Sequence, residues 1–313
     1  MMNKSKIDWC DFSWNPVTGC RHGCEYCYAR KMARRFSGDI RINIGNKILQ
    51  KQLDGLYVLT EPFKDEAGNV LLYPAGFEPT LHEYRLLMPA EKKKPANIFV
   101  CSMADLFGEW VPDEWIKRVF DACKAAPWHN YLFLTKNPKR YQTLAIGGIL
   151  PKGENFWYGS STPRNDNEIF WSDEYNTFFS IEPILEEVLP ADVPVDWVIL
   201  GAETGMRSTK TYPKREWIDK IAAACSENGI PFFMKDSKEL RAVWGDEPLI
   251  REMPPQLQHP EEKPIPRCDK CEHCTKVRQG KRGMCRNCEK ENRHIDARYA
   301  RTSPAWCPRR KGK

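Results

Sequence analysis

Six short, nearly continuous apolar runs recur in the chain, at 97–102, 131–136, 155–160, 177–182, 197–201 and 231–235. Such runs are typical of strands buried on both faces, and residues 113–126 and 214–228 have the apolar spacing of helices. Asp113 is a possible N-cap of the first helix, and Gly229 is a stop signal after the second. Because strands and helices alternate, we expect an α/β fold containing a complete or partial (β/α) TIM-like barrel.

Polar residues end almost every one of these runs. In a parallel β/α barrel, chemistry is built at the carboxyl ends of the strands. Strand ends also meet solvent and are polar for that reason alone, although Glu182, between an apolar run and Pro183, fits that explanation less well. The polar residues are Ser102, Asp105, Thr135, Lys136, Ser160, Ser161, Thr162, Glu182, Glu203, Thr204, Lys235 and Asp236.

Two stretches interrupt the alternation of strands and helices. The region 38–95 is irregular, and we expect it to insert a helix or a small lid. The run MPPQLQHPEEKPIP at 253–266 holds five prolines, which is typical of a semi-rigid linker. We therefore predict a barrel domain at 1–254, a linker at 255–266 and a separate cysteine-rich metal-binding module at 267–313.

Charge divides the chain in the same place. Residues 263–313 carry 16 Lys and Arg against 5 Asp and Glu, which leaves 32 against 37 of the chain's 48 and 42 for residues 1–262. A basic tail can attract nucleic acid or an acidic protein, or it can simply be a solubilising extension. With no long apolar run and no apolar signal region at the start, we expect neither a membrane nor secretion, and a cytoplasmic location.

Most of the 13 cysteines fall into two groups, a pattern that favours metal binding in a reducing compartment. Cys10, Cys101, Cys123 and Cys225 stand alone and are best interpreted as small buried hydrophobes.

The first group is Cys20, Cys24 and Cys27, with spacing C-x3-C-x2-C. Three thiolates can hold three irons of a [4Fe-4S] cluster and leave the fourth iron open. A zinc ion would require a fourth ligand, and His22 is the only close candidate, but its position inside the loop makes simultaneous binding awkward. The spacing favours iron.

This loop, with the aromatic Tyr26 before its last cysteine, resembles that of the radical S-adenosylmethionine superfamily. The resemblance extends over about residues 7–254. Within the superfamily, this part of the chain is similar to the uncharacterised bacteriophage-type radical S-adenosylmethionine family. The matching segments are WNPVTGC at 14–20, CYAR at 27–30, SMADLFGEWVP at 102–112, FLTKNPKR at 133–140, SIEP at 180–183 and LGAETG at 200–205.

The resemblance implies a cofactor, a reaction and site residues. S-adenosylmethionine would chelate the open iron, and an electron from the cluster would cleave it to a 5′-deoxyadenosyl radical. This radical would then abstract a hydrogen from the substrate. A flavodoxin- or ferredoxin-type donor would supply the electron. The resemblance makes Tyr26 a cofactor-binding residue. It places Ser102 and Asp105 at the methionine amine, and Ser160, Glu182 and Glu203 at the ribose or adenine. Lys136 and Lys235 could bind an anionic substrate or pair with nearby carboxylates.

The second group is Cys268, Cys271, Cys274, Cys285, Cys288 and Cys307, in a segment with little apolar core, so a metal must supply folding energy. One zinc could take Cys271, Cys285, Cys288 and either Cys268 or Cys274. A second choice, slightly preferred, is Cys271, Cys274, Cys285 and Cys307, and an auxiliary [4Fe-4S] cluster competes with zinc. We expect a nucleic acid or nucleotide substrate; the alternatives are a peptide or small-molecule substrate, or a zinc-dependent nucleic-acid-binding protein without turnover.

Overall fold

The computed structural model describes residues 2–164, 168–188, 195–204 and 212–258, and three strands nearer the C-terminus. The chain divides into two units, Met1–Leu257 and Gln258–Lys313. The first unit extends past the predicted domain end at residue 254, because residues 255–257 form a short 3-10 helix, η4 (Pro255–Leu257), whose Leu257 is buried in a core of the first unit. The remainder of the predicted linker lies outside the described residues, except Gln258.

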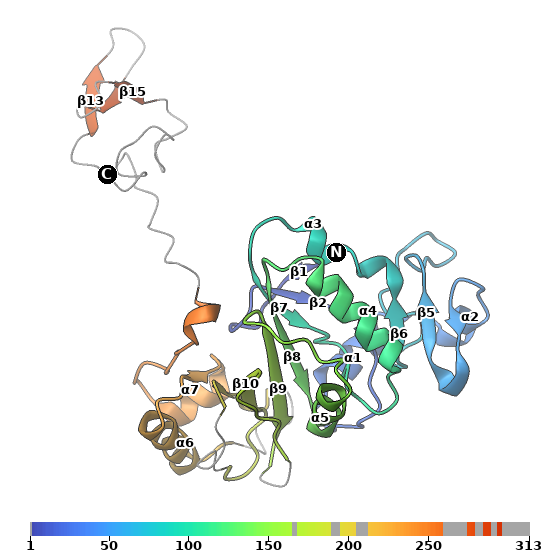
Figure 1. Cartoon of the computed structure of the whole chain (residues 1–313). Helices are drawn as coiled ribbons and strands as arrows, with labels where there is room; N and C mark the ends of the chain where they lie inside the picture. The colour runs from blue at the N-terminus through green and yellow to red at the C-terminus, as the bar shows by residue number, and fades with distance from the viewer. Residues whose placement is uncertain are drawn as a thin grey trace. The chain divides into compact units, whose positions relative to one another are not determined.

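The first unit is built on one large sheet (Figure 1). Strand β1 runs antiparallel to β2, and every other neighbouring pair is parallel. In sheet order the strands are β1 (Asn3–Lys4), β2 (Phe12–Trp14), β7 (Asn97–Val100), β8 (Asn130–Thr135), β9 (Phe156–Thr162), β10 (Asn176–Ile181), β11 (Val198–Leu200) and β12 (Phe232–Met234). Among the described residues β12 does not pair with β2, so the sheet is the partial form of the expected barrel.

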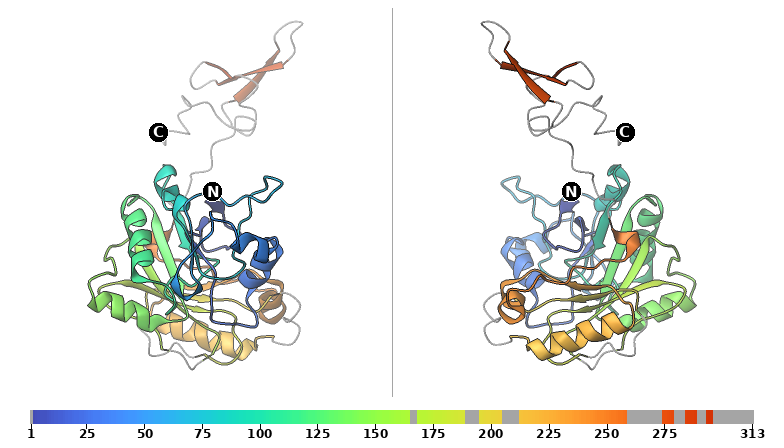
Figure 2. Two further views of the ribbon diagram at one scale, coloured as in Figure 1. Left: turned by 90° about the vertical axis from the view of Figure 1, so that its right-hand side faces the viewer. Right: turned by 90° about the vertical axis from the view of Figure 1, so that its left-hand side faces the viewer.

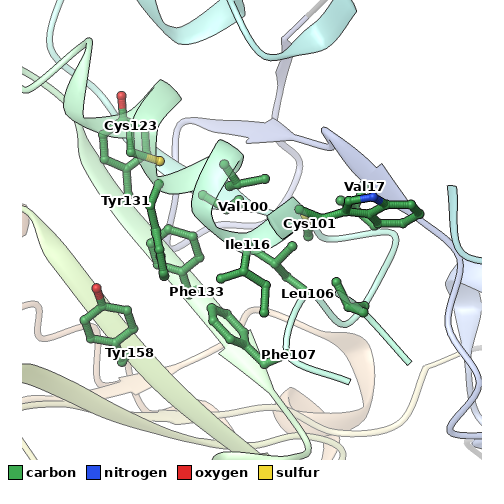
Figure 3. Close-up of a cluster of buried hydrophobic side chains, with 14 of the residues drawn as sticks. Val17, Val100, Cys101, Leu106, Phe107, Ile116, Cys123, Tyr131, Phe133 and Tyr158 are labelled. Atoms are coloured by element: carbon green, nitrogen blue, oxygen red, sulfur yellow. The ribbon is translucent and has the colours of Figure 1, made fainter. Parts of the chain in front are cut away.

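Helices cover the outer face of this sheet, and Figure 2 shows them following one another around it. They are α4 (Asp113–Lys124), α5 (Pro138–Ile146), α6 (Arg215–Glu227) and α7 (Lys238–Trp244). Helices α4 and α5 pack on β7, β8 and β9 through a cluster that includes Ile116, Phe107 and Phe133 (Figure 3). A second cluster joins α6 and α7 to β10, β11 and β12.

The inner face of the sheet is closed around Trp9, which lies ahead of β2. Its ring centroid is 4.7 Å from that of Phe99 and 6.2 Å from those of Phe178 and Trp197. These partners come from β7, from β10 and from the residue before β11, so the sheet must curve for one side chain to contact all three. Leu257 belongs to the same cluster. This cluster, which we call the Trp9 plug and which consists of Trp9, Phe99, Phe178, Trp197 and Leu257, lies toward the amino ends of the strands. It leaves the carboxyl edge of the sheet for polar residues.

The six apolar runs form strands as predicted, and the two predicted helices are α4 and α6. Asp113 is the first residue of α4 rather than its N-cap, and its carboxylate pairs with Arg140 at 2.6 Å. Gly229 follows the C-cap of α6 with φ of +64°, which matches the predicted stop.

Region 38–95 contains helices, as expected: α2 (Ile40–Ile44) and α3 (Met88–Glu91), with the 3-10 helices η1 (Leu53–Gly55) and η2 (Glu83–Arg85). It also supplies three strands of a four-stranded sheet that the sequence did not predict. The order of that sheet is β3 (Val17–Thr18), β6 (Thr80–His82), β5 (Tyr57–Leu59) and β4 (Gln50–Lys51). Strands of two or three residues are too short to produce a periodic pattern. Helix α1 (Tyr28–Arg35) precedes this region.

The described part of the second unit is an antiparallel sheet of β13 (Cys274–Arg278), β14 (Met284–Cys288) and β15 (Arg293–Ile295). Its register pairs Cys274 with Cys288 and Val277 with Cys285, and Cys288 is buried. Cys268, Cys271 and Cys307 lie outside the described residues, so the choice of metal ligands stays a prediction. Among the described helices, none combines the length and apolar character required to cross a membrane.

Candidate functional site

The cysteine loop, residues 20–27, is held between the two sheets of the first unit. The amide of Gly19 donates to Met103 O at 2.9 Å, next to the end of β7, and the amide of Cys20 donates to Phe77 O at 3.2 Å, just before β6. Gly19 has φ of +91°, and a Cβ there would lie 2.2 Å from Glu78 O. Only glycine fits at this entry to the loop.

His22 ties the middle of the loop to the large sheet. Its Nε2 donates to Asp105 Oδ2 at 2.7 Å, and its ring packs edge-on against Trp110 with centroids 4.9 Å apart. The same carboxylate accepts hydrogen bonds from Thr135 Oγ1 at 2.7 Å and from Lys136 N at 2.9 Å. Asp105 therefore joins the cysteine loop to the carboxyl end of β8.

The end of the loop becomes the start of α1. Cys27 is the N-cap residue, and its Sγ accepts a hydrogen bond from the amide of Arg30 at 3.3 Å. The Arg30 guanidinium turns back and donates to Cys20 O at 3.4 Å. Arg30 therefore contacts both the first and the last cysteine of the loop.

The thiols of the loop are close enough to affect one another. The pKa of Cys20 is raised to about 12, mainly by burial, and the negative charges of Asp105, Cys24 and Cys27 contribute to this shift. Burial is also the main cause that raises the pKa of Tyr26, followed by the charge of Cys24 and a hydrogen bond with its thiol. Holding these thiols as thiolates would require positive charge, which bound iron supplies.

The three thiols of the loop are a donor set that suits an iron–sulfur cluster, in which thiolates bind different irons. Among the described residues, no group of three or more His, Cys, Asp or Glu side chains is placed to hold a metal ion. His22, the only close fourth ligand for zinc, is committed to Asp105. Three coupled thiols on one loop are therefore compatible with the predicted cluster.

Tyr26 extends from the loop toward the ends of β8 and β11. The Lys136 ammonium lies 5.4 Å from its ring centroid, and the charge of Glu203 contributes to the raised pKa of the phenol. Lys136 Nζ also donates to Ser161 Oγ at 3.3 Å. Tyr26, Lys136, Ser161 and Glu203 thus meet at the carboxyl edge, beside Cys24.

Ser102 and Asn15 hold the end of β7 in an unusual turn. Cys101 has φ of +61°, rare for a residue other than glycine, and its amide donates to Trp14 O at 2.8 Å. Ser102 Oγ donates to Asn15 Oδ1 at 3.2 Å, and Ser102 O accepts from the Tyr28 hydroxyl at 2.8 Å. Tyr28 is the first residue of α1 and follows Cys27 directly, so this turn contacts the helix that begins where the cysteine loop ends.

Glu182 and Lys235 form an ion pair at the ends of β10 and β12. They flank Gly201, where a Cβ would lie 2.9 Å from Cγ of Glu182. Ser180, which shares the inward face of β10 with Phe178, is fully buried, and its hydroxyl has no hydrogen-bond partner among the described residues. The pair matches the alternative that Lys235 binds a neighbouring carboxylate.

Ser160 and Ser161 point in opposite directions on β9. Ser160 Oγ accepts a hydrogen bond from the amide of Phe170 at 2.9 Å, on the face that Tyr158 shares with the outer helices. Ser161 shares the inward face with Trp157. The structure therefore brings Ser161, and not the predicted Ser160, to Lys136, whereas Tyr26, Asp105 and Glu203 lie around the loop as expected. Their binding roles stay predictions.

Sequence reasoning missed three residues of this centre: Asn15, Ser161 as an inward residue, and His22 as an anchor. Asn15 lies in the segment WNPVTGC, and period-two counting from Trp157 distinguishes Ser161 from Ser160. The contact between His22 and Asp105 was not predictable from the sequence, because 83 residues separate them.

These features define an α/β protein with an open parallel sheet and a three-cysteine loop anchored at its carboxyl edge. Residues 4–299 match the family model described as "Protein of unknown function (DUF5131)", and the chain belongs to that family. The description names no reaction, and nothing in it bears on the resemblance to a bacteriophage-type family. No curated protein matches the sequence.

Solved structures of spore photoproduct lyase are similar to this chain at a low level. A mutant with bound AdoMet and dinucleoside spore photoproduct has a TM-score of 0.41 and 9% identity over 75% of this chain and 78% of that chain. A second mutant has a TM-score of 0.43 and 9% identity over the same shares. A complex with dinucleoside spore photoproduct has a TM-score of 0.41 and 9% identity, again over 75% and 78%. A likeness this weak says nothing of the activity of this chain.

Proposed function

We propose that this protein is a radical S-adenosylmethionine enzyme. The observation that carries the proposal is the anchored loop, in which Cys20, Cys24 and Cys27 are electrostatically coupled and tied to the carboxyl edge of a parallel sheet through His22 and Asp105. With the cluster and S-adenosylmethionine bound, the site would supply a 5′-deoxyadenosyl radical.

The residues of the chain would bind and orient the reactants. Cys20, Cys24 and Cys27 would ligate three irons, and Tyr26, beside Cys24, would cover the cofactor. The turn at Ser102 would present its polar groups to the methionine end, whereas Glu182 and Glu203 would face the ribose or adenine. Ser161 replaces Ser160 in this proposal, because its hydroxyl lies on the inner face with Lys136.

The test is anaerobic reconstitution with iron and sulfide. Wild type should take up about four irons at this site, develop a visible charge-transfer band and release 5′-deoxyadenosine with dithionite. Cys20→Ala, Cys24→Ala and Cys27→Ala should each abolish cleavage and leave a folded protein, and Cys10→Ala, a lone cysteine outside the loop, is the matched control. Retained cleavage in any loop variant, or tight zinc binding without iron uptake in wild type, would contradict the proposal.

We further propose a nucleic acid or nucleotide-bearing substrate. Its support is the charge of segment 263–313, with 16 Lys and Arg against 5 Asp and Glu. Binding through phosphates should weaken steeply with salt, by a log–log slope of about −0.9 per neutralised phosphate on duplex DNA. Metal in the C-terminal unit, as zinc or a second cluster, would organise this basic segment.

Binding to duplex DNA, single-stranded DNA and RNA at two salt concentrations tests the substrate class. A Lys276, Lys281 and Arg282 triple alanine variant should bind more weakly and with a shallower salt slope than wild type. A triple alanine variant at Lys117, Lys124 and Lys238, which lie on α4 and α7, removes the same charge elsewhere. Salt-insensitive binding, or none, would favour a peptide or small-molecule substrate.

A further inference from the structure

Helix α1 carries an unusual set of exposed side chains directly after the cysteine loop. Ala29 and Ala33 are its buried residues. The α1 outer face, defined here as Lys31, Met32, Arg34, Arg35 and Phe36, is exposed, with 43% of the surface of both Met32 and Phe36 accessible. The helix contains no acidic residue. Its outer face therefore combines clustered positive charge with apolar surface.

The three cations of this face have no partner among the described residues. Ion pairs are frequent elsewhere in the first unit, as on α4 (Arg118 with Glu83) and α7 (Arg241 with Asp236). For Lys31, Arg34 and Arg35 the structure has no carboxylate within 4.0 Å in the part of the chain it describes. Arg35 only lies over the neighbouring Phe36 ring, at 5.4 Å. As far as the described residues go, these cations are available to an anionic partner.

Charge elsewhere makes this face stand out. The first unit, residues 1–257, carries 35 Asp and Glu against 32 Lys and Arg, so as a whole it would weakly repel an acidic molecule. A local basic face on an acidic body orients an acidic partner during encounter. The negative remainder of the surface would disfavour other orientations.

The apolar part of the face favours a protein over a nucleic acid as that partner. Met32 lies on the last turn of α1 and Phe36 is the C-cap residue that follows this turn, and both are exposed. Methionine, aromatic residues and arginine are enriched at protein interfaces, whereas surfaces that bind phosphate backbones are mainly polar and basic. Exposed methionine and phenylalanine beside arginine match the protein case.

The position of the face indicates what that protein does. The helix begins directly after Cys27, which caps it, so Lys31 to Phe36 lie within about 14 Å of the loop along the helix axis. The proposed reaction consumes one electron per cleavage, and that electron must come from outside the chain.

We propose that the α1 outer face is the docking surface for a small acidic electron-carrier protein that reduces the cluster. The carrier gives up one electron and the cluster gains it, with no other bond made or broken. This inference rests on the proposed function of the cysteine loop.

The test compares a protein reductant with a small one. Reduced flavodoxin should drive 5′-deoxyadenosine formation in wild type, and Arg34→Glu/Arg35→Glu should weaken its apparent affinity at least tenfold at low salt. Dithionite, which requires no docking, should drive the variant at the wild-type rate. Lys117→Glu/Lys238→Glu makes the same change of charge on α4 and α7 and should behave as wild type with both reductants.

Binding of oxidised flavodoxin, followed by flavin fluorescence, separates this inference from the proposed function, since it requires no turnover. Weaker binding only in the α1 variant supports the docking surface, even if wild type were to cleave no S-adenosylmethionine. Equal flavodoxin binding by the two double variants, equal loss with dithionite, or a selective loss of duplex DNA binding in the α1 variant would overturn it.

Discussion

At the residue scale, Asp105 illustrates what the sequence does and does not reveal. A polar residue after an apolar run marks the carboxyl end of a strand, and this located Asp105 correctly. Its partners were not predictable, because His22 and Thr135 are 83 and 30 residues away in the chain. Both carboxylate oxygens already accept two hydrogen bonds, from Phe107 N, Thr135, Lys136 N and His22. We expect its main role to be holding the loop.

Replacing this carboxylate should therefore affect stability and iron uptake together. Asp105→Asn turns one acceptor oxygen into a donor facing other donors, and we expect a loss of about 2 kcal/mol in the free energy of unfolding. Urea unfolding measures it. The matched change Asp113→Asn, in a half-exposed ion pair with Arg140, should cost less than about 1 kcal/mol. Equal costs at the two positions would show that Asp105 is not an anchor.

Buried thiols make stability depend on alkaline pH. Burial raises the pKa of Cys101 and of Cys225 from 9.0 to about 12. Between those values the unfolded chain has lost protons that the folded chain keeps, so the stabilising contribution is complete below about pH 9 and declines as pH rises toward 12. Cys225→Ala should flatten the dependence of the unfolding free energy on pH between 8 and 10.5, measured by urea titration. Parallel profiles for the two proteins would contradict this assignment.

At the element scale, the long elements were predictable and the short ones were not. Six apolar runs predicted β7 to β12, since continuous burial leaves a strong signal. The small sheet of β3, β4, β5 and β6 escaped, because its strands have two or three residues each. The missed sheet is what fixes one side of the cysteine loop, through Phe77 and Glu78. The three candidate cysteine ligands could be predicted from the sequence, whereas the small sheet that holds their loop in place could not.

Two glycines on either side of Cys20 test that support. At Gly19 an added Cβ would meet the Glu78 backbone at 2.2 Å, whereas at Gly23, with φ of +74°, nothing lies within 4 Å. Gly23→Ala should cost about 1 kcal/mol for its left-handed backbone alone. Gly19→Ala should cost clearly more and should lower iron uptake on reconstitution, measured by iron content per folded chain. Similar stability and iron content in the two variants would argue that the small sheet does not position the loop.

At the scale of the whole molecule, charge and proline content indicated a chain in two parts. The predicted end of the first part, residue 254, lies before the structural one because the signal came from composition, and a short buried turn leaves little trace in composition. Asn97 Nδ2 donates to Leu257 O at 2.7 Å, and Asn130 Nδ2 donates to Gln256 O at 3.0 Å. Residues 255–257 are thus part of the sheet's support.

Truncation should detect this difference. A chain that ends at Gln258 keeps Leu257, which is 1% exposed, and should unfold at nearly the denaturant concentration of the first unit in the full chain. A chain that ends at Pro254 loses a buried leucine and two hydrogen bonds, and should be about 3 kcal/mol less stable. Equal midpoints for the two truncated chains would contradict the placement of η4.

The plug formed by Trp9 also sets an order for assembly during synthesis. Its partners Phe99, Phe178 and Trp197 are spread over most of the first unit, and Asp8, beside it, pairs with Arg251 at 2.7 Å. The final packing of Trp9 therefore requires that the chain through Trp197 has been made, and the cysteine loop, which follows Trp9 in the chain, is made before the strands that anchor it. Because His22 of the loop is anchored to Asp105, which binds Thr135 at the end of β8, the loop reaches its final geometry only after these strands are in place, and the proposed cluster would find its three cysteines positioned only then.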